Sequence, residues 1–265
     1  MIGFIDSSRH IQAPVRLVLV NVIIFLLLHL VIAAAVIAGG VDTASTVTVA
    51  AHDALDLPLD LHRWLYRPWT IVTHMVMHSG VWHLLVNMLW LWWMGSIFLQ
   101  FFDRRQLVTL YLLGGVTGAV LALFTSALYP TGTWLVGASA AVAAVMMGIA
   151  CYRPGYRVSM LIIGDVALKW LVAAIIIIDL LGLGENLAGH IAHLGGALTG
   201  VTFGLLIKRG YDITRLHRVT KATGADTSCP TEVELDAVLD KVRRSGFASL
   251  SRQERDILKR ASSTV

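Results

Sequence analysis

The stretch AHLGGALTGVTFG, residues 192–204, places a small residue at every fourth position: Ala192, Gly196, Gly200 and Gly204. An earlier apolar stretch has the same spacing at Ala140, Ala144 and Gly148. Stripes of small residues at helical spacing let two membrane helices approach backbone to backbone. We therefore predict two helices that pack closely along these stripes.

Each stripe lies beside a polar residue in an apolar setting. Ser139 precedes Ala140, and His193 follows Ala192. Polar groups inside membrane segments are costly and usually functional, and a serine with a histidine is the smallest set for nucleophilic hydrolysis. A single membrane serine more often bonds to its own helix. The pairing of the two stripes is what favours a hydrolytic site.

The composition excludes an ordinary soluble globular protein. Hydrophobic residues make up 56% of the chain and charged residues 14%, and the mean hydropathy is +0.71. Most apolar spans reach the roughly 20 residues that cross a hydrocarbon core. We predict an all-α membrane protein with six spans, at about 17–38, 81–101, 107–128, 135–152, 166–183 and 188–207. Ser139 then lies one turn into the fourth span. Residues 17–38 are predicted to be a retained helix, since they are too long for a signal peptide and lack its cleavage site.

The positions of lysine and arginine predict the orientation of the spans. With both termini in the cytoplasm, the cytoplasmic segments hold Arg9, Arg16, Arg104, Arg105, Arg153, Arg157, Lys169, Lys208 and Arg209. The outer loops then hold only Arg63 and Arg67. We predict a multi-pass protein of the inner (plasma) membrane. Its long outer connection, residues 40–69, is expected to lie on or in the outer leaflet.

The chain changes character after the last span. We predict a membrane domain over residues 1–208, a linker over 209–230 and a cytoplasmic helical hairpin over 231–265. Capping-box patterns mark two helix starts, at Thr231–Glu234 and Ser251–Glu254, and Gly246 lies where the first helix should end. This extension is expected to be an interaction or regulatory element that binds a protein partner.

The second span carries polar residues at helical spacing. His83 and Asn87 are four residues apart, as are His74 and His78, so each pair lies on one helical face. His83 and Asn87 lie inside the apolar run and could donate hydrogen bonds to an oxyanion, which such donors stabilise strongly where water is scarce. Alternatively, they are a pair that binds two helices together.

Together these motifs resemble those of the rhomboid intramembrane serine proteases. The motifs are His-x4-His-x3-Asn at His78–Asn87, Gly-x-Ser at Gly137–Ser139, and Ala-His-x-Gly-Gly-x3-Gly at Ala192–Gly200. The resemblance covers all six spans in order and implies a rhomboid-like bundle. The tail is similar to the short helical extension of Bacteroidetes-type rhomboids.

The resemblance implies a role for each matching residue. Ser139 would be the nucleophile and His193 its general base, a dyad without the aspartate of soluble triads. The oxyanion hole would consist of His83, Asn87 and the Ser139 amide. Three further residues have supporting roles: His78 and His74 would hold the hydrolytic water, and Gly137 would shape the loop before the serine. The aromatic-rich loop 64–69 would lie in the outer leaflet.

The implied activity is endopeptidase cleavage of single-span membrane proteins in the lipid bilayer, with no cofactor, metal or nucleic acid. Three further residues bear on whether this activity is retained. Ala140 stands where many rhomboids have glycine, and we expect activity to survive this change. His190 is a rival general base, although the motif favours His193. Asp179, in the fifth span, is expected to reach outward to water more than to orient a histidine.

Three other functions compete with proteolysis. The chain could be a rhomboid-like, non-catalytic protein that binds membrane proteins, although such a protein need not keep both Ser139 and His193. A metal site could form from His74, His78 and His83, but no carboxylate is near them in sequence. A small transporter is the third alternative, but broken helices with internal repeats, typical of transporters, are not evident in this sequence.

Overall fold

A computed structural model describes residues 3–129, 134–160, 164–181, 186–215, 217–218, 232–251, 253–255 and 257–258. These residues are largely helical. The chain divides into two compact units, Met1–Val219 and Thr220–Val265, and each is described by itself.

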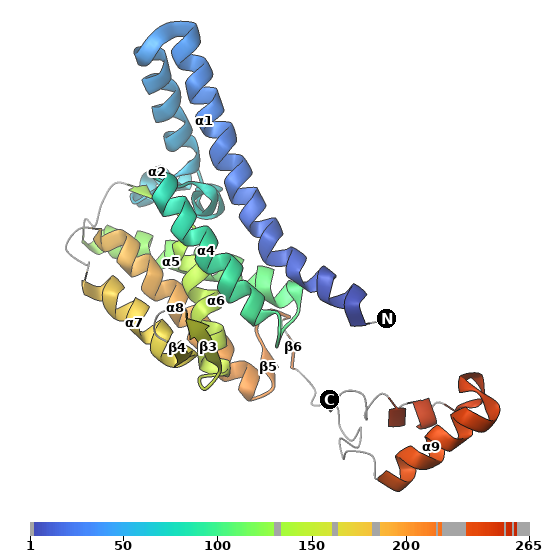
Figure 1. Ribbon diagram of the computed structural model, residues 1–265. Coiled ribbons are helices and arrows are strands. Elements are labelled where there is room, and N and C mark those ends of the chain that lie inside the picture. Colours follow the sequence, from blue (N-terminus) through green and yellow to red (C-terminus); the bar gives the residue numbers. More distant parts are fainter. Residues whose placement is uncertain are drawn as a thin grey trace. The chain divides into compact units, whose positions relative to one another are not determined.

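The larger unit is a helical bundle with three short antiparallel strand pairs (Figure 1). Its helices are α1 (Gly3–Leu55), α2 (Leu61–Leu65), α3 (Thr70–Thr73), the 3-10 turn η1 (His74–Val76), α4 (Val81–Phe98), α5 (Arg104–Leu128), α6 (Ser139–Tyr152), α7 (Leu168–Leu181) and α8 (Leu187–Lys208). The strands pair β1 (Leu57–Pro58) with β2 (Trp134–Leu135), β3 (Arg157–Met160) with β4 (Gly164–Ala167), and β5 (Tyr211–Asp212) with β6 (His217–Arg218).

A helix lies over each of the six apolar spans predicted from the sequence. Among the described residues, α1, α4, α5 and α8 are long and apolar enough to cross a membrane, and α6 is a shorter apolar helix. The helical membrane class is therefore confirmed, while the number of crossings stays a prediction.

The outer connection differs from the predicted one, because α1 runs on to Leu55 after a break at Gly39–Gly40. Gly40 adopts a φ of +77°, a left-handed conformation that glycine takes without strain. The two arms of α1 then form a helical hairpin (Figure 1). Within the second arm, Thr43, Thr46 and Thr48 each donate a hydrogen bond to the carbonyl four residues earlier, so their hydroxyl groups are satisfied inside the helix.

The predicted close packing of the two small-residue stripes is confirmed. A Cβ atom on Gly196 would overlap the carbonyl oxygen of Ala140, and one on Gly200 would overlap that of Ala144. Farther along, a Cβ on Gly204 would lie 2.7 Å from the Cβ of Cys151. The backbones of α6 and α8 therefore touch at three successive turns, and no larger residue fits at these positions.

Helix α5 joins this contact through glycines that the sequence analysis did not single out. A Cβ on Gly118 would lie 2.6 Å from the Ala192 carbonyl oxygen and 2.7 Å from the Ala140 Cβ. One on Gly114 would overlap the Ala144 side chain. The core of the bundle is thus three helices at backbone distance, with α4 and α7 packed outside them.

The smaller unit contains α9 (Glu232–Ser245) and the 3-10 turn η2 (Phe247–Ser249). Gly246 follows α9 with a φ of +76°, as expected at a helix end. The second capping box is present: the Ser251 amide donates to Glu254 at 2.7 Å, and the Glu254 amide donates to the Ser251 hydroxyl at 3.3 Å. Thr231, of the first box, and the end of the second helix lie outside the described residues, so the complete hairpin stays a prediction.

The α6–α8 contact predicts that Gly196→Ala will destabilise the protein. The added methyl group must push two backbones apart, which costs about 3 kcal/mol and lowers Tm by roughly 5–10 °C. Thermal unfolding in detergent measures this change. The control is Gly155→Ala, because a Cβ on Gly155 meets nothing within 4 Å. Equal Tm values for the two variants would contradict the backbone contact.

Candidate active site

Ser139 is the first residue of α6, not a residue one turn into a helix as the sequence predicted. The strand β2, Trp134–Leu135, lies a few residues earlier, and its Leu135 pairs with Leu57 in β1. Gly137 then turns the chain with a φ of +117°. The first amides of an α-helix have no partner within the helix. The Ser139 amide has no backbone acceptor among the described residues, so it can bind an anion, as the predicted oxyanion role requires.

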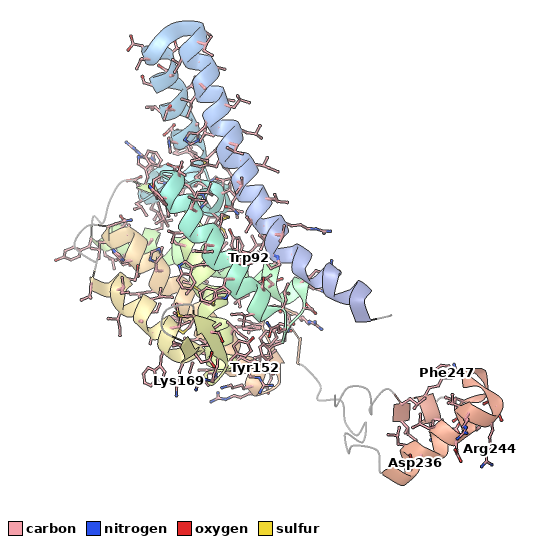
Figure 2. The ribbon with its side chains drawn as sticks, in the orientation of Figure 1. Trp92, Tyr152, Lys169, Asp236, Arg244 and Phe247 are labelled. Atoms are coloured by element: carbon pink, nitrogen blue, oxygen red, sulfur yellow. The ribbon has the colours of Figure 1, made fainter. Side chains whose placement is uncertain are left out.

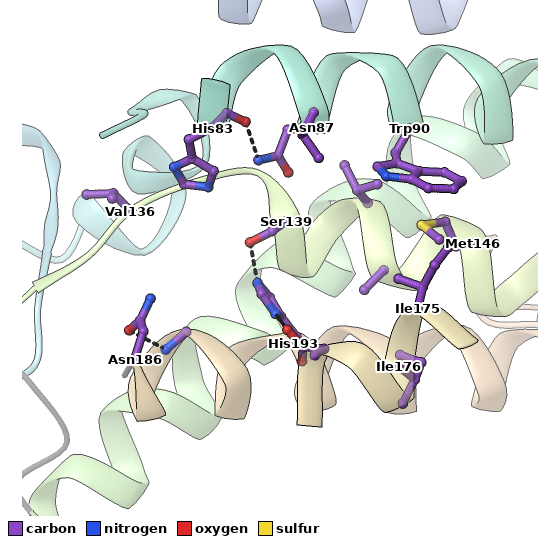
Figure 3. Close-up of a pocket in the computed structure, with 15 residues that line it drawn as sticks. His83, Asn87, Trp90, Val136, Ser139, Met146, Ile175, Ile176, Asn186 and His193 are labelled. Carbon is purple, nitrogen blue, oxygen red and sulfur yellow. Dashed lines mark hydrogen bonds and ion pairs between the residues drawn. The ribbon is translucent and has the colours of Figure 1, made fainter. Parts of the chain in front are cut away.

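Ser139 and His193 are in direct contact. The Nε2 atom of His193, on α8, lies 2.6 Å from the Ser139 hydroxyl oxygen (Figure 3). This is hydrogen-bond distance between a nucleophile and a base. The predicted meeting of these two residues across the small-residue stripes is therefore confirmed as geometry.

Asp179, on α7, points into the site, and the prediction that it reaches outward was wrong. Its Oδ1 atom lies 2.6 Å from the Nδ1 atom of His193 and 2.9 Å from that of His190. The side chain is only 16% exposed. A buried carboxylate is costly unless it is paired, and the two imidazoles supply that pairing. The predicted Ser139–His193 pair is thus joined by an aspartate that hydrogen-bonds to His193.

The same three side chains are the set that could hold a metal ion among the described residues. The donor atoms lie within 4.8 Å of one another. However, the two nitrogens are at hydrogen-bond distance from the carboxylate. Because zinc sits about 2.0–2.2 Å from each nitrogen or oxygen ligand, an ion would have to replace both hydrogen bonds. The arrangement fits a hydrogen-bonded cluster better than a metal centre.

His83 lies against Gly137, and its ring faces the loop that leads to Ser139 (Figure 3). The Ser79 amide donates to His83 Nδ1 at 3.4 Å, and the Ser79 hydroxyl is 3.0 Å from the same atom. A neutral imidazole that accepts at Nδ1 carries its proton on Nε2. A Cβ on Gly137 would lie 2.8 Å from that Nε2 atom, so the absence of a side chain at residue 137 is what lets the donor approach the serine.

Asn87 lies one turn farther along α4, and its amide nitrogen donates to the His83 carbonyl at 2.8 Å. An amide group has two hydrogens, so one remains for another acceptor. His83 and Asn87 both line the same cavity as Ser139. The geometry thus brings the three predicted oxyanion residues to one place, while their role stays a prediction.

His74 and His78 do not line this cavity. The His74 carbonyl accepts a hydrogen bond from the Gly137 amide at 2.9 Å, and the His74 ring is bonded to the Thr70 carbonyl at 3.0 Å. His78 stacks edge-on against His83, with 5.2 Å between ring centres, and its ring nitrogens lack a hydrogen bond of normal geometry within the described residues. His74 therefore supports the Gly137 turn, and the water-holding roles stay predictions.

The cavity has a volume of about 280 Å³. It is lined by His83, Val86, Asn87, Trp90, Val136, Ser139, Val142, Ala143, Met146, Ile175, Ile176, Asp179, Asn186, Gly189 and His193. Sequence reasoning missed Asn186, which caps α8 by accepting a hydrogen bond from the Gly189 amide at 3.1 Å. Its place just before an apolar helix is a recognisable capping signal.

The methyl group of Ala140 lies outside the cavity, against Gly118 of α5. A glycine on the neighbouring helix therefore provides the space for alanine at this position.

Gly137→Ala is predicted to cost about 1–3 kcal/mol, because it adds backbone strain and a clash with the His83 ring. Gly164→Ala is the matched control, since Gly164 also has a left-handed φ, +78°, but open space around its Cβ. Unfolding in detergent should show a larger loss of stability for Gly137→Ala than for Gly164→Ala. Adding His83→Ala to the Gly137→Ala variant should recover part of that stability. Identical losses at both glycines would contradict the contact.

Burial lowers the pKa of His74, which lies before α4, to about 4. The unfolded chain therefore binds a proton on His74 near pH 6.5, whereas the folded protein binds that proton only near pH 4. We expect stability to fall by up to about 3 kcal/mol as the pH drops through this window. Tm measured between pH 7 and pH 4.5 tests this, and His74→Gln should flatten the slope. A His74→Gln variant with the same slope as the wild type would refute the assignment.

Comparison with known proteins identifies the family of this chain. A family model described as the Rhomboid domain matches residues 66–210, more than half of the chain. A second model, a family of unknown function (DUF6576), matches residues 230–264. The Bacteroidetes-type assignment of the tail stays a prediction.

Three curated proteins are similar to the chain. It is 33% identical over 138 residues to "Presenilin-associated rhomboid-like protein A, mitochondrial" of Danio rerio, covering 48% of the chain and 34% of that protein. It is 26% identical over 173 residues to "RHOMBOID-like protein 1" of Arabidopsis thaliana (61% and 40%) and 27% identical over 136 residues to "Rhomboid protease GluP" of Bacillus subtilis (50% and 24%). The chain spans less than half the length of each relative. With its apolar helices, the chain is an integral membrane protein and belongs to the rhomboid family.

Proposed function

We propose that this protein is an intramembrane serine endopeptidase that cleaves transmembrane segments of membrane proteins. The observation that carries the proposal is the 2.6 Å contact between the Ser139 hydroxyl and His193 Nε2 on the wall of a cavity within an apolar bundle. A serine that only stabilised its helix would bond to its own backbone. Ser139 instead faces a base on another helix.

In the first step, the Ser139 oxygen attacks the carbonyl carbon of the scissile peptide bond. His193 takes the hydroxyl proton at Nε2. The resulting oxyanion accepts hydrogen bonds from His83, Asn87 and the Ser139 amide. Fixed donors in a site with little water are worth more than the same donors in water, and removing one donor typically costs about 10²- to 10³-fold in rate.

In the second step, His193 returns the proton to the departing amine, which leaves an acyl-enzyme on Ser139. A water molecule then attacks the acyl carbon as His193 accepts one of its protons. The tetrahedral intermediate collapses, and Ser139 regains its hydroxyl. His78, whose ring lies against that of His83 and whose ring nitrogens lack a hydrogen bond of normal geometry within the described residues, is proposed to hold that water before it enters.

The substrate is proposed to enter between α4 and α7. The cavity walls there are apolar, formed by Val86 and Trp90 of α4 and by Ile175 and Ile176 of α7. Because backbone groups in hydrocarbon are satisfied only within a helix or barrel, a substrate helix must unwind to expose one peptide bond. We therefore expect cleavage near helix-weakening residues, with small side chains at the cut.

The protein is proposed to lie in the inner (plasma) membrane with both termini in the cytoplasm. Tyr152 and Lys169 lie at one end of the bundle (Figure 2). Arg153 adds positive charge there, 5.2 Å from the Tyr152 ring centre. Basic residues favour the cytoplasmic side, which supports this orientation. The smaller unit is proposed to bind a protein partner.

The test is cleavage of a single-span reporter by the purified protein in liposomes. We expect Ser139→Ala and His193→Ala each to abolish cleavage. Ser96→Ala and His29→Ala are matched controls, because each side chain hydrogen-bonds to the carbonyl four residues earlier on its own helix. These two variants should cleave as the wild type does.

A fluorophosphonate probe separates a protease from a non-catalytic binding protein. An activated serine attacks its phosphorus and expels fluoride, so Ser139 should be labelled in the wild type and not in His193→Ala. Cleavage that persists in Ser139→Ala, or that disappears on chelation of metal ions, would refute the serine mechanism. An unlabelled wild type that binds the reporter without cutting it would indicate the binding function instead.

A further inference from the structure

The hydrogen bonds of Asp179 are arranged around a single oxygen atom. Oδ1 lies 2.6 Å from His193 Nδ1 and 2.9 Å from His190 Nδ1. The other oxygen, Oδ2, is buried and has no hydrogen-bond partner among the described residues. The two imidazole rings are nearly perpendicular, at 89°, with 5.9 Å between their centres. The carboxylate is therefore held from two directions through one atom.

This contact determines which nitrogen of His193 can act as a base. A carboxylate accepts hydrogen bonds only, so the close nitrogen of each ring must be the one that carries a proton. A neutral His193 protonated at Nδ1 leaves a lone pair at Nε2, and Nε2 is the atom that lies 2.6 Å from the Ser139 hydroxyl. Without Asp179, the other tautomer would place a proton between the base and the nucleophile.

His190 is arranged differently from His193. Its Nδ1 atom is directed at Asp179, and it is not among the residues that line the cavity. The rival role of general base therefore does not fit its position. What His190 does contact is the carboxylate that orients His193, and a second donor fixes the direction of that carboxylate.

We propose that Asp179 is a positioning residue for the reaction and that His190 holds Asp179 in place, which forms the chain Ser139–His193–Asp179–His190. This proposal rests on the proposed function. Asp179 selects the His193 tautomer that can accept the serine proton, and its negative charge stabilises the imidazolium that forms. The site is thus a Ser-His pair with an aspartate supplied by α7, and no other carboxylate lies within hydrogen-bond distance of His193 among the described residues.

The first test compares Asp179→Asn with the wild type in the liposome assay. The amide is nearly the same size but no longer selects the tautomer. We expect kcat to fall by about 10²- to 10⁴-fold with KM little changed, as in soluble hydrolases that lose an orienting carboxylate. Asp179→Glu should recover part of kcat, and His190→Gln should lower kcat by about tenfold. Asp165→Asn, on the β3–β4 hairpin, is the matched control and should have no effect.

A purely structural role for Asp179 would lower stability without changing the pH dependence of the reaction. The groups that face His193 are Ser139 on α6, Asp179 on α7, His190 on its own helix and His83 on α4. Asp179 is the anion among them. Removing it destabilises the imidazolium, so the acidic limb of the kcat/KM profile should move to lower pH in Asp179→Asn.

A measurement on the wild type keeps the proposal testable if the variants do not fold. Nitrogen NMR of ¹⁵N-histidine-labelled protein should show neutral His193 protonated at Nδ1. A His193 protonated at Nε2, or an Asp179→Asn variant with wild-type kcat and pH profile, would overturn the positioning role while the proposed protease function stands. Cleavage by Ser139→Ala would instead overturn the proposed function itself.

Discussion

The site depends on the backbone contact between α6 and α8. The Ser139 hydroxyl and His193 Nε2 come from different helices, so the distance between the helix axes sets the distance between the two atoms. A side chain at Gly196 or Gly200 would separate the axes and break the 2.6 Å contact. Small residues here do what a disulfide or a metal does in other folds: they fix the separation of two segments that are distant in sequence.

The remaining groups are each brought by a different element. Helix α4 contributes His83 and Asn87, the turn before α6 gives His83 access through Gly137, and α7 contributes Asp179. The nucleophile is at the start of its helix, where the free amide and the helix dipole both favour negative charge. The side of the cavity that would receive the oxyanion and the side that would receive the proton are thus built from separate helices.

Much of this could be predicted from the sequence, because the spacing of small residues directly encodes close helix packing. The direction of Asp179 could not. It follows Ile175–Ile178, and a helix that is apolar on all sides has no polar face to show which way one charge points. The second arm of α1 was also missed: residues 40–69 were predicted to be a connection, whereas threonines such as Thr43 hydrogen-bond to their own helix. Gly114 and Gly118 were not singled out, because the sequence does not show which helices they contact.

The interlocked glycine contacts also restrict how α8 can slide along α6. One residue of helix corresponds to a translation of about 1.5 Å, and a hydrogen bond from a hydroxyl to an imidazole nitrogen is lost over a smaller displacement than that. The contacts at Gly196, Gly200 and Gly204, one helical turn apart, therefore fix the position of α8 along α6. A substitution that shifts this register would separate His193 from Ser139 without touching either residue.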